Sequence, residues 1–409
     1  MLKDLISPFK SGSFKALWIG QSFSRLGDSI MSVMLPLIVY SISGSALTMG
    51  IVMALNMIPQ IILTPITGVL ADRMSRKKLM IVSDIVRLIT LSAISALSIS
   101  NYQININIIY VYAVISGAMS SLFQPAYSAV RAEVFTEEIR NSANSLTQIS
   151  EQFSRLIGPS IGALIISFSS IGIGFGLDAL TFLISVVSLI FLKINKNIVQ
   201  PIGNESKLLL FKNELVGGFN EIKKQEWLKV TIIVFSLFNI ITTSFISILL
   251  PWLIKIYYKL PPYVYGTLIT AIGIGSLFAA FIFSLRKRWK HRGIIVYTSY
   301  IILGITLCGT PFINQITYLI FVMITFGVIQ TIFSLIWEGS LQELIPINSF
   351  GKVASLDMMG SYILLPIGYL ITGWLTEYVG GIKAILYETI FLIISAVIPL
   401  LISKIRKFD

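Results

Sequence analysis

The sequence has little charge, one histidine and one cysteine. Asp, Glu, Lys and Arg make up 12% of its 409 residues, whereas an ordinary soluble domain carries about 25%. Because Cys308 is alone, the chain has neither an internal disulfide nor a cysteine cluster for a metal. His291 lies in a basic loop, so proton transfer inside a membrane would depend on carboxylates. These shortages argue against a soluble enzyme and against a metal centre.

Catalytic and nucleotide-binding motifs are missing as well. The sequence contains no DDxxD, HxxxH or CxxC pattern and no Gly-rich phosphate-binding loop. A membrane enzyme needs such a constellation of residues at the membrane face. We therefore expect no catalysis, no cofactor, no metal and no nucleotide, and a polytopic membrane enzyme is kept only as a remote alternative.

Apolar residues dominate what is present. They make up 55% of the chain, and the mean hydropathy is +0.85. A soluble core stops growing at about 250–300 residues, so most of this apolar surface is expected to face lipid. A spanning helix needs about 20 mostly apolar residues. Twelve segments meet that need: 15–42, 46–70, 78–100, 104–131, 144–169, 171–194, 228–255, 263–285, 292–312, 315–341, 354–377 and 383–404.

Basic residues predict the orientation of these segments. Most of the 31 Lys and Arg fall in loops on the side of the two termini, and such loops are typically cytoplasmic. The opposite loops hold only Lys255, Lys259 and Lys383. We expect a multi-pass protein of the bacterial inner membrane with both termini in the cytoplasm. The net charge of +12 is then explained by basic loops at the phospholipid surface, and it does not indicate binding to nucleic acid.

The two halves of the chain resemble each other. At a shift of about 210 positions, Glu133 falls on Glu343 and Gly158 on Gly368. The hydrophilic stretch 195–227 separates six segments from six and alternates apolar and charged residues, which is typical of an amphipathic surface helix. We predict an all-α membrane protein of two pseudo-symmetric six-helix bundles, 1–194 and 228–409, joined by this cytoplasmic linker.

The loop GVLADRMSRKKLM after the second segment resembles the loop 2–3 signature of the major facilitator superfamily. The matching positions are Gly68, Asp72, Arg73, Arg76 and Lys77. The resemblance implies a cytoplasmic gate in which glycine lets two helices approach. It also suggests that Arg73 pairs with an acid at the same membrane face, such as Glu133.

The fifth segment reads SRLIGPSIGALI and resembles the signature of antiporter-type exporters in that superfamily. Gly158, Pro159 and Gly162 match, whereas Ser154 and Ala163 stand where the pattern prefers glycine. The alternative reading is ordinary close packing of small residues. The signature favours export.

Other stretches point to one branch of the superfamily. FKALWIGQSFSRLGDSIM, QPAYSAVRAEV and SANSLTQISEQ resemble the macrolide-efflux and enterobactin-exporter branch of drug–proton antiporters. The fourth segment lacks the mid-helix arginine of many such antiporters, and its Arg131 lies at the cytoplasmic end. The resemblance implies proton-coupled export, by alternating access, of an amphipathic drug, macrolide-like compound, siderophore or peptide antibiotic. Uptake or lipid movement on the same scaffold remains the main alternative.

Charges within the spanning segments are candidates for function, because each costs at least about 2.5–3.5 kcal/mol to insert. Arg25 and Asp28 share a helix face, and so do Glu151 and Arg155; each pair can also be structural. Polar faces of segments four and ten, related by the repeat, complete the predicted cavity. Its residues are Arg25, Asp28, Gln124, Glu151, Arg155, Gln330, Ser334 and Glu338.

Three further expectations concern the surroundings of this cavity. Asp84 and Arg87 are interpreted as structural residues, whereas the sequence does not decide between a structural and a functional role for Asp178 and Glu388. Aromatic wall candidates are Trp18, Phe23, Phe123, Tyr127, Phe238 and Trp337. A few acids in an apolar chamber favour a cationic or neutral lipophile as substrate. We expect a monomer whose partners are this substrate, protons and the bilayer.

Overall fold

In the computed structural model, the regular structure of the described residues is entirely helical. The described residues are 6–100, 102–194, 219, 222–223, 226–285, 289–345, 353, 356–357 and 359–406, with Asp72, Ser403 and Lys404 described by backbone alone. The chain divides into two compact units, Met1–Pro201 with Leu260–Thr270 and Ile202–Lys259 with Ala271–Asp409. The predicted amphipathic helix in 195–227 lies largely outside the described residues, and the predicted domain boundaries stay predictions.

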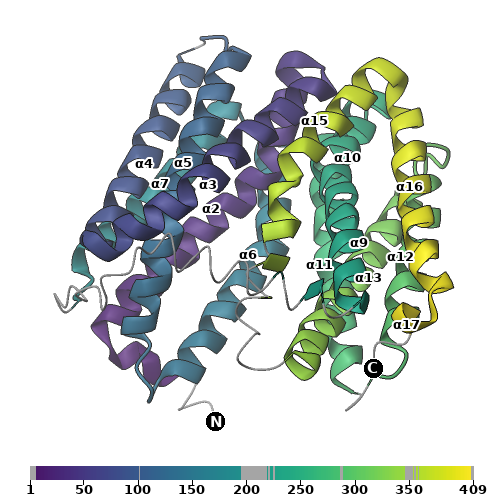
Figure 1. Cartoon of the computed structure of the whole chain (residues 1–409). Helices are drawn as coiled ribbons and strands as arrows, with labels where there is room; N and C mark the ends of the chain where they lie inside the picture. The colour runs from purple at the N-terminus through teal and green to yellow at the C-terminus, as the bar shows by residue number, and fades with distance from the viewer. Residues whose placement is uncertain are drawn as a thin grey trace. The chain divides into compact units, whose positions relative to one another are not determined.

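The first unit contains six long helices after a short one (Figure 1). They are η1 (Ser7–Lys10), α2 (Gly12–Ser43), α3 (Ala46–Arg73), α4 (Arg76–Ile99), α5 (Ile106–Val134), α6 (Arg140–Phe168) and α7 (Ile171–Phe191). Small polar side chains fix where several begin, because Ser11, Ser45, Asn105 and Ser170 each accept a bond from a first-turn N–H. Gly44, with φ of 64°, ends α2 in the left-handed conformation.

Close backbone approach and interhelical hydrogen bonds hold this unit together. Helix α2 packs against α6 and α7, and α5 packs against α3 and α4. A Cβ atom added to Gly117 of α5 would lie 1.8 Å from the carbonyl oxygen of Asn56 in α3. In the same pair of helices, Thr67 Oγ1 donates to the Ser121 carbonyl at 2.6 Å. In lipid there is no hydrophobic driving force between helices. Close packing at small residues and hydrogen bonds from hydroxyl residues therefore stabilise the contacts between these helices.

The second unit is also helical. Its elements are α9 (Glu226–Ser244), η2 (Phe245–Leu249), α10 (Leu250–Trp252), η3 (Leu253–Tyr257), α12 (Arg292–Cys308), α13 (Ile316–Leu344), α15 (Leu365–Leu375), η4 (Thr376–Gly380), α16 (Gly381–Leu401) and α17 (Ser403–Arg406). Helix α11 (Pro262–Ser284) begins in the residues assigned to the first unit and continues in the second. Within the second unit, α12 packs against α13 and α16, and α9 packs against α15 and α16.

Nine helical segments among the described residues are long and apolar enough to cross a membrane. One of them, Met359–Leu401, runs for 43 residues and includes both α15 and α16. Its backbone changes direction at Gly380, where φ is 100°. Helix α6 is not among the nine, and α12 has only 17 residues. The all-helical membrane architecture is as predicted, while the number twelve stays a prediction.

Candidate functional site

A small cavity lies inside the first unit, between α2, α5 and α6. We call it the α2–α5–α6 cavity; its lining residues are Leu17, Trp18, Gln21, Ser22, Arg25, Tyr127, Phe135, Thr147 and Ser150. Its volume is about 10 Å³, which is close to the room that one water molecule needs. Two of the predicted aromatic walls, Trp18 and Tyr127, are part of it. The sequence signal for this face is the run of polar residues along α2 at helical spacing.

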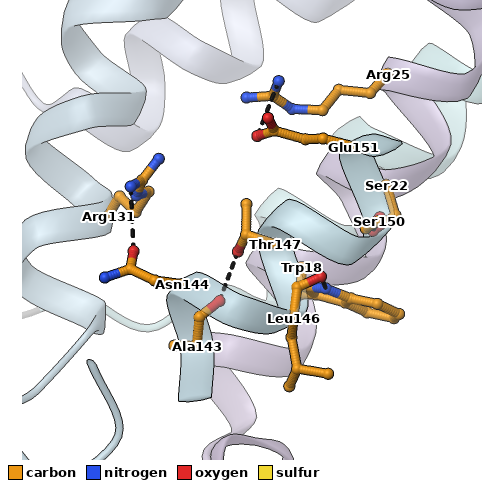
Figure 2. A network of polar contacts seen from close by, with 10 residues as sticks. All are labelled: Trp18, Ser22, Arg25, Arg131, Ala143, Asn144, Leu146, Thr147, Ser150 and Glu151. Carbon is orange, nitrogen blue, oxygen red and sulfur yellow. Dashed lines mark hydrogen bonds and ion pairs between the residues drawn. The ribbon is translucent and has the colours of Figure 1, made fainter. Parts of the chain in front are cut away.

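An ion pair joins two helices beside this cavity. Arg25 Nη1 of α2 lies 3.0 Å from Glu151 Oε1 of α6, and Figure 2 shows the two side chains reaching toward each other. The Arg25 side chain is 30% exposed and the Glu151 side chain 13%. The guanidinium also lies over the Tyr127 ring, 5.8 Å from its centre. Two charges that would each be costly in lipid thus neutralise one another.

This pairing corrects the prediction made from spacing along single helices. Arg25 was expected to pair with Asp28, and Glu151 with Arg155. Among the described side chains, Glu151 instead reaches α2, while Arg155 and Asp28 are exposed within their unit. The reason is the close packing of α6 on α2: Ser29 Oγ donates to the Ser154 carbonyl at 2.8 Å, one turn further along both helices.

Polar contacts around the ion pair fix the rest of this region. Trp18 Nε1 donates to the Leu146 carbonyl at 3.3 Å, and Ser150 Oγ donates to Ser22 Oγ at 2.5 Å. Arg131, the arginine at the end of α5, donates to Asn144 Oδ1 at 3.1 Å. Figure 2 places these contacts on facing sides of α2, α5 and α6. Side-chain hydrogen bonds therefore join α2 to α6, and the last turn of α5 to the first turns of α6.

A second charged group is buried where α2, α4 and α7 meet. Asp84 is fully buried and accepts a bond from Ser185 Oγ at 2.6 Å. Asp178 is 2% exposed and accepts from Thr181 Oγ1 at 3.2 Å. Both acids were set aside or left open by the sequence analysis, because nothing along one helix shows how deeply a side chain is buried.

Arg87 supplies the positive charge of that group. Its Nη2 donates to Ser120 Oγ at 2.9 Å, and its guanidinium lies 5.2 Å from the centre of the Phe182 ring. Asp28, Asp84 and Asp178 all lie close enough to interact electrostatically with Arg87. The two buried acids, Asp84 and Asp178, therefore lie within electrostatic reach of this guanidinium in the interior of the unit.

The comparisons with known proteins agree with this architecture. The model of the Major Facilitator Superfamily matches residues 17–363. The chain belongs to the Major Facilitator Superfamily. It is therefore a multi-pass membrane protein of a transporter family, and the recognition made from the loop and helix motifs is confirmed.

Relatives and solved structures support the same assignment. Macrolide efflux protein A of Streptococcus pyogenes is 24% identical over 402 residues, covering 97% of each chain. Multidrug efflux pump Tap of Mycolicibacterium fortuitum is 21% identical, covering 94% of each chain. The crystal structure of the nucleoside transporter NupG is 14% identical with a TM-score of 0.74, over 95% of this chain and 98% of NupG. The last comparison confirms the fold alone.

The loop 2–3 motif of the transporter differs in detail from the prediction. Glu133 of α5 lies 3.9 Å from Arg76 at the start of α4, rather than pairing with Arg73, which is exposed. Lys77 Nζ donates to the carbonyl oxygens of Ile190 and Leu192, each at 2.7 Å, and so caps the end of α7. The side chain of Asp72 lies outside the described residues.

Gly68 makes no close helix contact among the described residues, and its role in a cytoplasmic gate stays a prediction. A Cβ atom added there would meet no described atom within 4 Å. The exporter-type motif of α6, by contrast, does pack closely. Added Cβ atoms at Gly158 and Gly162 would lie 2.5 Å from Ser29 Oγ and 2.6 Å from the Ile30 carbonyl oxygen of α2, and Pro159 between them is buried inside α6.

In the second unit, Gln330 is held by neighbouring helices. Tyr300 donates to its Oε1 at 2.8 Å, and its Nε2 donates to Thr242 Oγ1 at 3.1 Å. Ser334 and Glu338 on the same helix are exposed within the unit, as is Gln124 in the first unit. Their role in a central cavity stays a prediction.

One ion pair of the second unit was missed. Glu343, which the repeat aligns with Glu133, pairs with Arg292 at the start of α12, and Arg292 also donates to Ser340 Oγ at 3.2 Å. Acids at equivalent positions of the two halves thus each hold an arginine. The basic residues 286–288, which the sequence pattern aligned with the first-half cluster, lie outside the described residues.

Proposed function

We propose that the transporter exports an amphipathic small molecule across the bacterial inner membrane in exchange for protons, by alternating access. The observation that carries this proposal is the Arg25–Glu151 ion pair beside the α2–α5–α6 cavity. Ionisable side chains inside spanning helices are costly to insert, so such a pair marks a candidate site for binding or coupling. No catalytic role is assigned to these groups.

Glu151 is the acid to which we assign the proton. When Glu151 is ionised, Arg25 neutralises it. When Glu151 takes up a proton, the pair loses its attraction, and the packing of α6 on α2 loses one of its contacts. A change of this kind at a helix interface can bias the equilibrium between two conformations. Asp28, which lies near both Arg25 and Arg87, is the second acid available for coupling.

The direction of transport is inferred from α6. Gly158, Pro159 and Gly162 resemble the exporter signature, and the chain is similar throughout to proteins named as efflux proteins. Macrolide-like drugs, siderophores and peptide antibiotics are the substrate candidates. Uptake or lipid movement on the same scaffold is the second candidate, since a shared fold does not fix direction. We further propose cytoplasmic termini and a monomer.

Retention of labelled erythromycin in cells tests this proposal. Cells producing the transporter should retain less than control cells, and an uncoupler should remove the difference. Cells that produce Glu151→Gln at the same level should behave like the control cells. Higher retention in producing cells would instead establish uptake, and a difference that persists with the uncoupler would contradict proton coupling.

A further inference from the structure

Two hydrogen-bond donors at the α2–α5–α6 cavity have no partner among the described residues. Gln21 is 6% exposed, and its Nε2 atom is fully buried without an acceptor. Arg25 directs Nη1 to Glu151, but its Nε atom is likewise buried without an acceptor. Both residues line the same cavity. Since buried polar groups are nearly always bonded to protein or to ordered water, two orphaned donors at one cavity point to an acceptor oxygen from outside the chain.

Other polar side chains of this lining are already committed. Trp18 Nε1 donates to Leu146, Thr147 Oγ1 donates to the Ala143 carbonyl at 2.8 Å, and Ser150 Oγ donates to Ser22. Figure 2 shows these contacts turned toward the protein's own acceptors. The two donors of this lining that are buried without a partner, Gln21 Nε2 and Arg25 Nε, both belong to α2.

Charge and size narrow the ligand group. The positive charge of Arg25 is balanced by Glu151 at 3.0 Å, so a carboxylate of the ligand would bring an unbalanced negative charge. A cationic group of the ligand would be repelled by the two N–H donors. The cavity volume of about 10 Å³ accommodates one oxygen atom rather than a ring. A neutral carbonyl, ether or hydroxyl oxygen satisfies both limits.

We propose that Gln21 Nε2 and Arg25 Nε bind one neutral acceptor oxygen of the transported molecule in the α2–α5–α6 cavity. Trp18 and Tyr127 line the same cavity and supply apolar ring surface. The inference rests on the proposed function and narrows its substrate to amphiphiles that carry a neutral acceptor oxygen, away from oxygen-free cations. An oxygen bound at Arg25 uses the same guanidinium that holds Glu151, which connects substrate binding to the acid assigned to the proton.

Equilibrium binding to the purified full chain in nanodiscs tests the inference. The probes are radiolabelled erythromycin, which carries carbonyl, ether and hydroxyl oxygens, and ethidium, which carries none. Gln21→Leu should raise the Kd for erythromycin roughly tenfold, as expected for one lost hydrogen bond to a buried donor. Gln21→Met, which keeps the length of the side chain and removes the donor without adding a charge, should do the same. Neither change should alter ethidium binding, which also reports that each variant is folded.

Thr147→Val is the matched control, because Thr147 lines the same cavity but its hydroxyl is already bonded within α6. It should leave the Kd for erythromycin unchanged. Equal Kd values for the wild type and both Gln21 variants would overturn the inference and leave the proposed function standing. So would a wild type that binds ethidium but not erythromycin. A wild type that binds neither probe would contradict the proposed function and this inference together.

Discussion

The pairing of Arg25 with Glu151 predicts a specific energetic coupling between α2 and α6. Arg25→Gln, Glu151→Gln and the double variant form a thermodynamic cycle that isolates this contact from other effects of each change. Exposed ion pairs contribute about 0–1 kcal/mol, while breaking a fully buried pair costs about 3–5 kcal/mol. Because the side chains are 30% and 13% exposed, we expect a coupling between these limits, about 1–3 kcal/mol.

The assay is unfolding of the purified protein in detergent, followed by the fluorescence of its tryptophans as denaturant is added. A second cycle, with Asp28→Asn in place of Glu151→Gln, is the internal comparison. The structure predicts the larger coupling for Arg25 with Glu151, because that contact is a direct ion pair. A larger coupling between Arg25 and Asp28 would refute the cross-helix pairing and restore the pairing predicted from helix spacing.

Three further predictions concern packing and charge in the first unit. Gly117→Ala should lower the unfolding midpoint strongly, because the added Cβ atom would lie 1.8 Å from the Asn56 carbonyl oxygen. Gly68→Ala is the control and should leave the midpoint unchanged, because no described atom lies within 4 Å of the added Cβ atom. Equal effects would contradict the packing of α5 on α3. Lys77→Met should cost about 1 kcal/mol of unfolding free energy through loss of the α7 cap, and the exposed neighbour Lys78→Met should be neutral. Arg87→Gln should lower the unfolding midpoint, and adding Asp84→Asn should recover part of the loss. No recovery would show that Arg87 stabilises the unit through Ser120 and the Phe182 ring and not through the acid.

Much of the fold follows from local rules in the sequence. The helix starts at Ser11, Ser45 and Ser170 are set by capping within a few residues, and the family was recognised from contiguous motifs around Gly68 and Gly158. The residues of the candidate site were found for a similar reason. Arg25 and Glu151 are charged residues in apolar segments, and that contrast is visible without any structure.

The partners of those residues could not be found in this way. Helical spacing describes neighbours on one helix, so it offered Asp28 to Arg25 and Arg155 to Glu151, whereas the close packing of α6 on α2 decided the actual pair. Its place on α4 suggested a structural role for Asp84, and its complete burial depends on how α7 packs against α4. Gln21 stands out as a polar residue in an apolar segment, but the absence of an acceptor for its Nε2 atom among the described residues can be seen only in the structure.

Proton movement measured directly in proteoliposomes tests the central claim, that substrate and protons move in opposite directions and depend on Glu151. Liposomes containing the transporter and a luminal pH dye are mixed with erythromycin at equal internal and external pH. As substrate enters down its gradient, protons should leave and the lumen should become alkaline, and this change should disappear in Glu151→Gln. Erythromycin entry with an acidified lumen, or with no pH change in the wild type, would contradict the account.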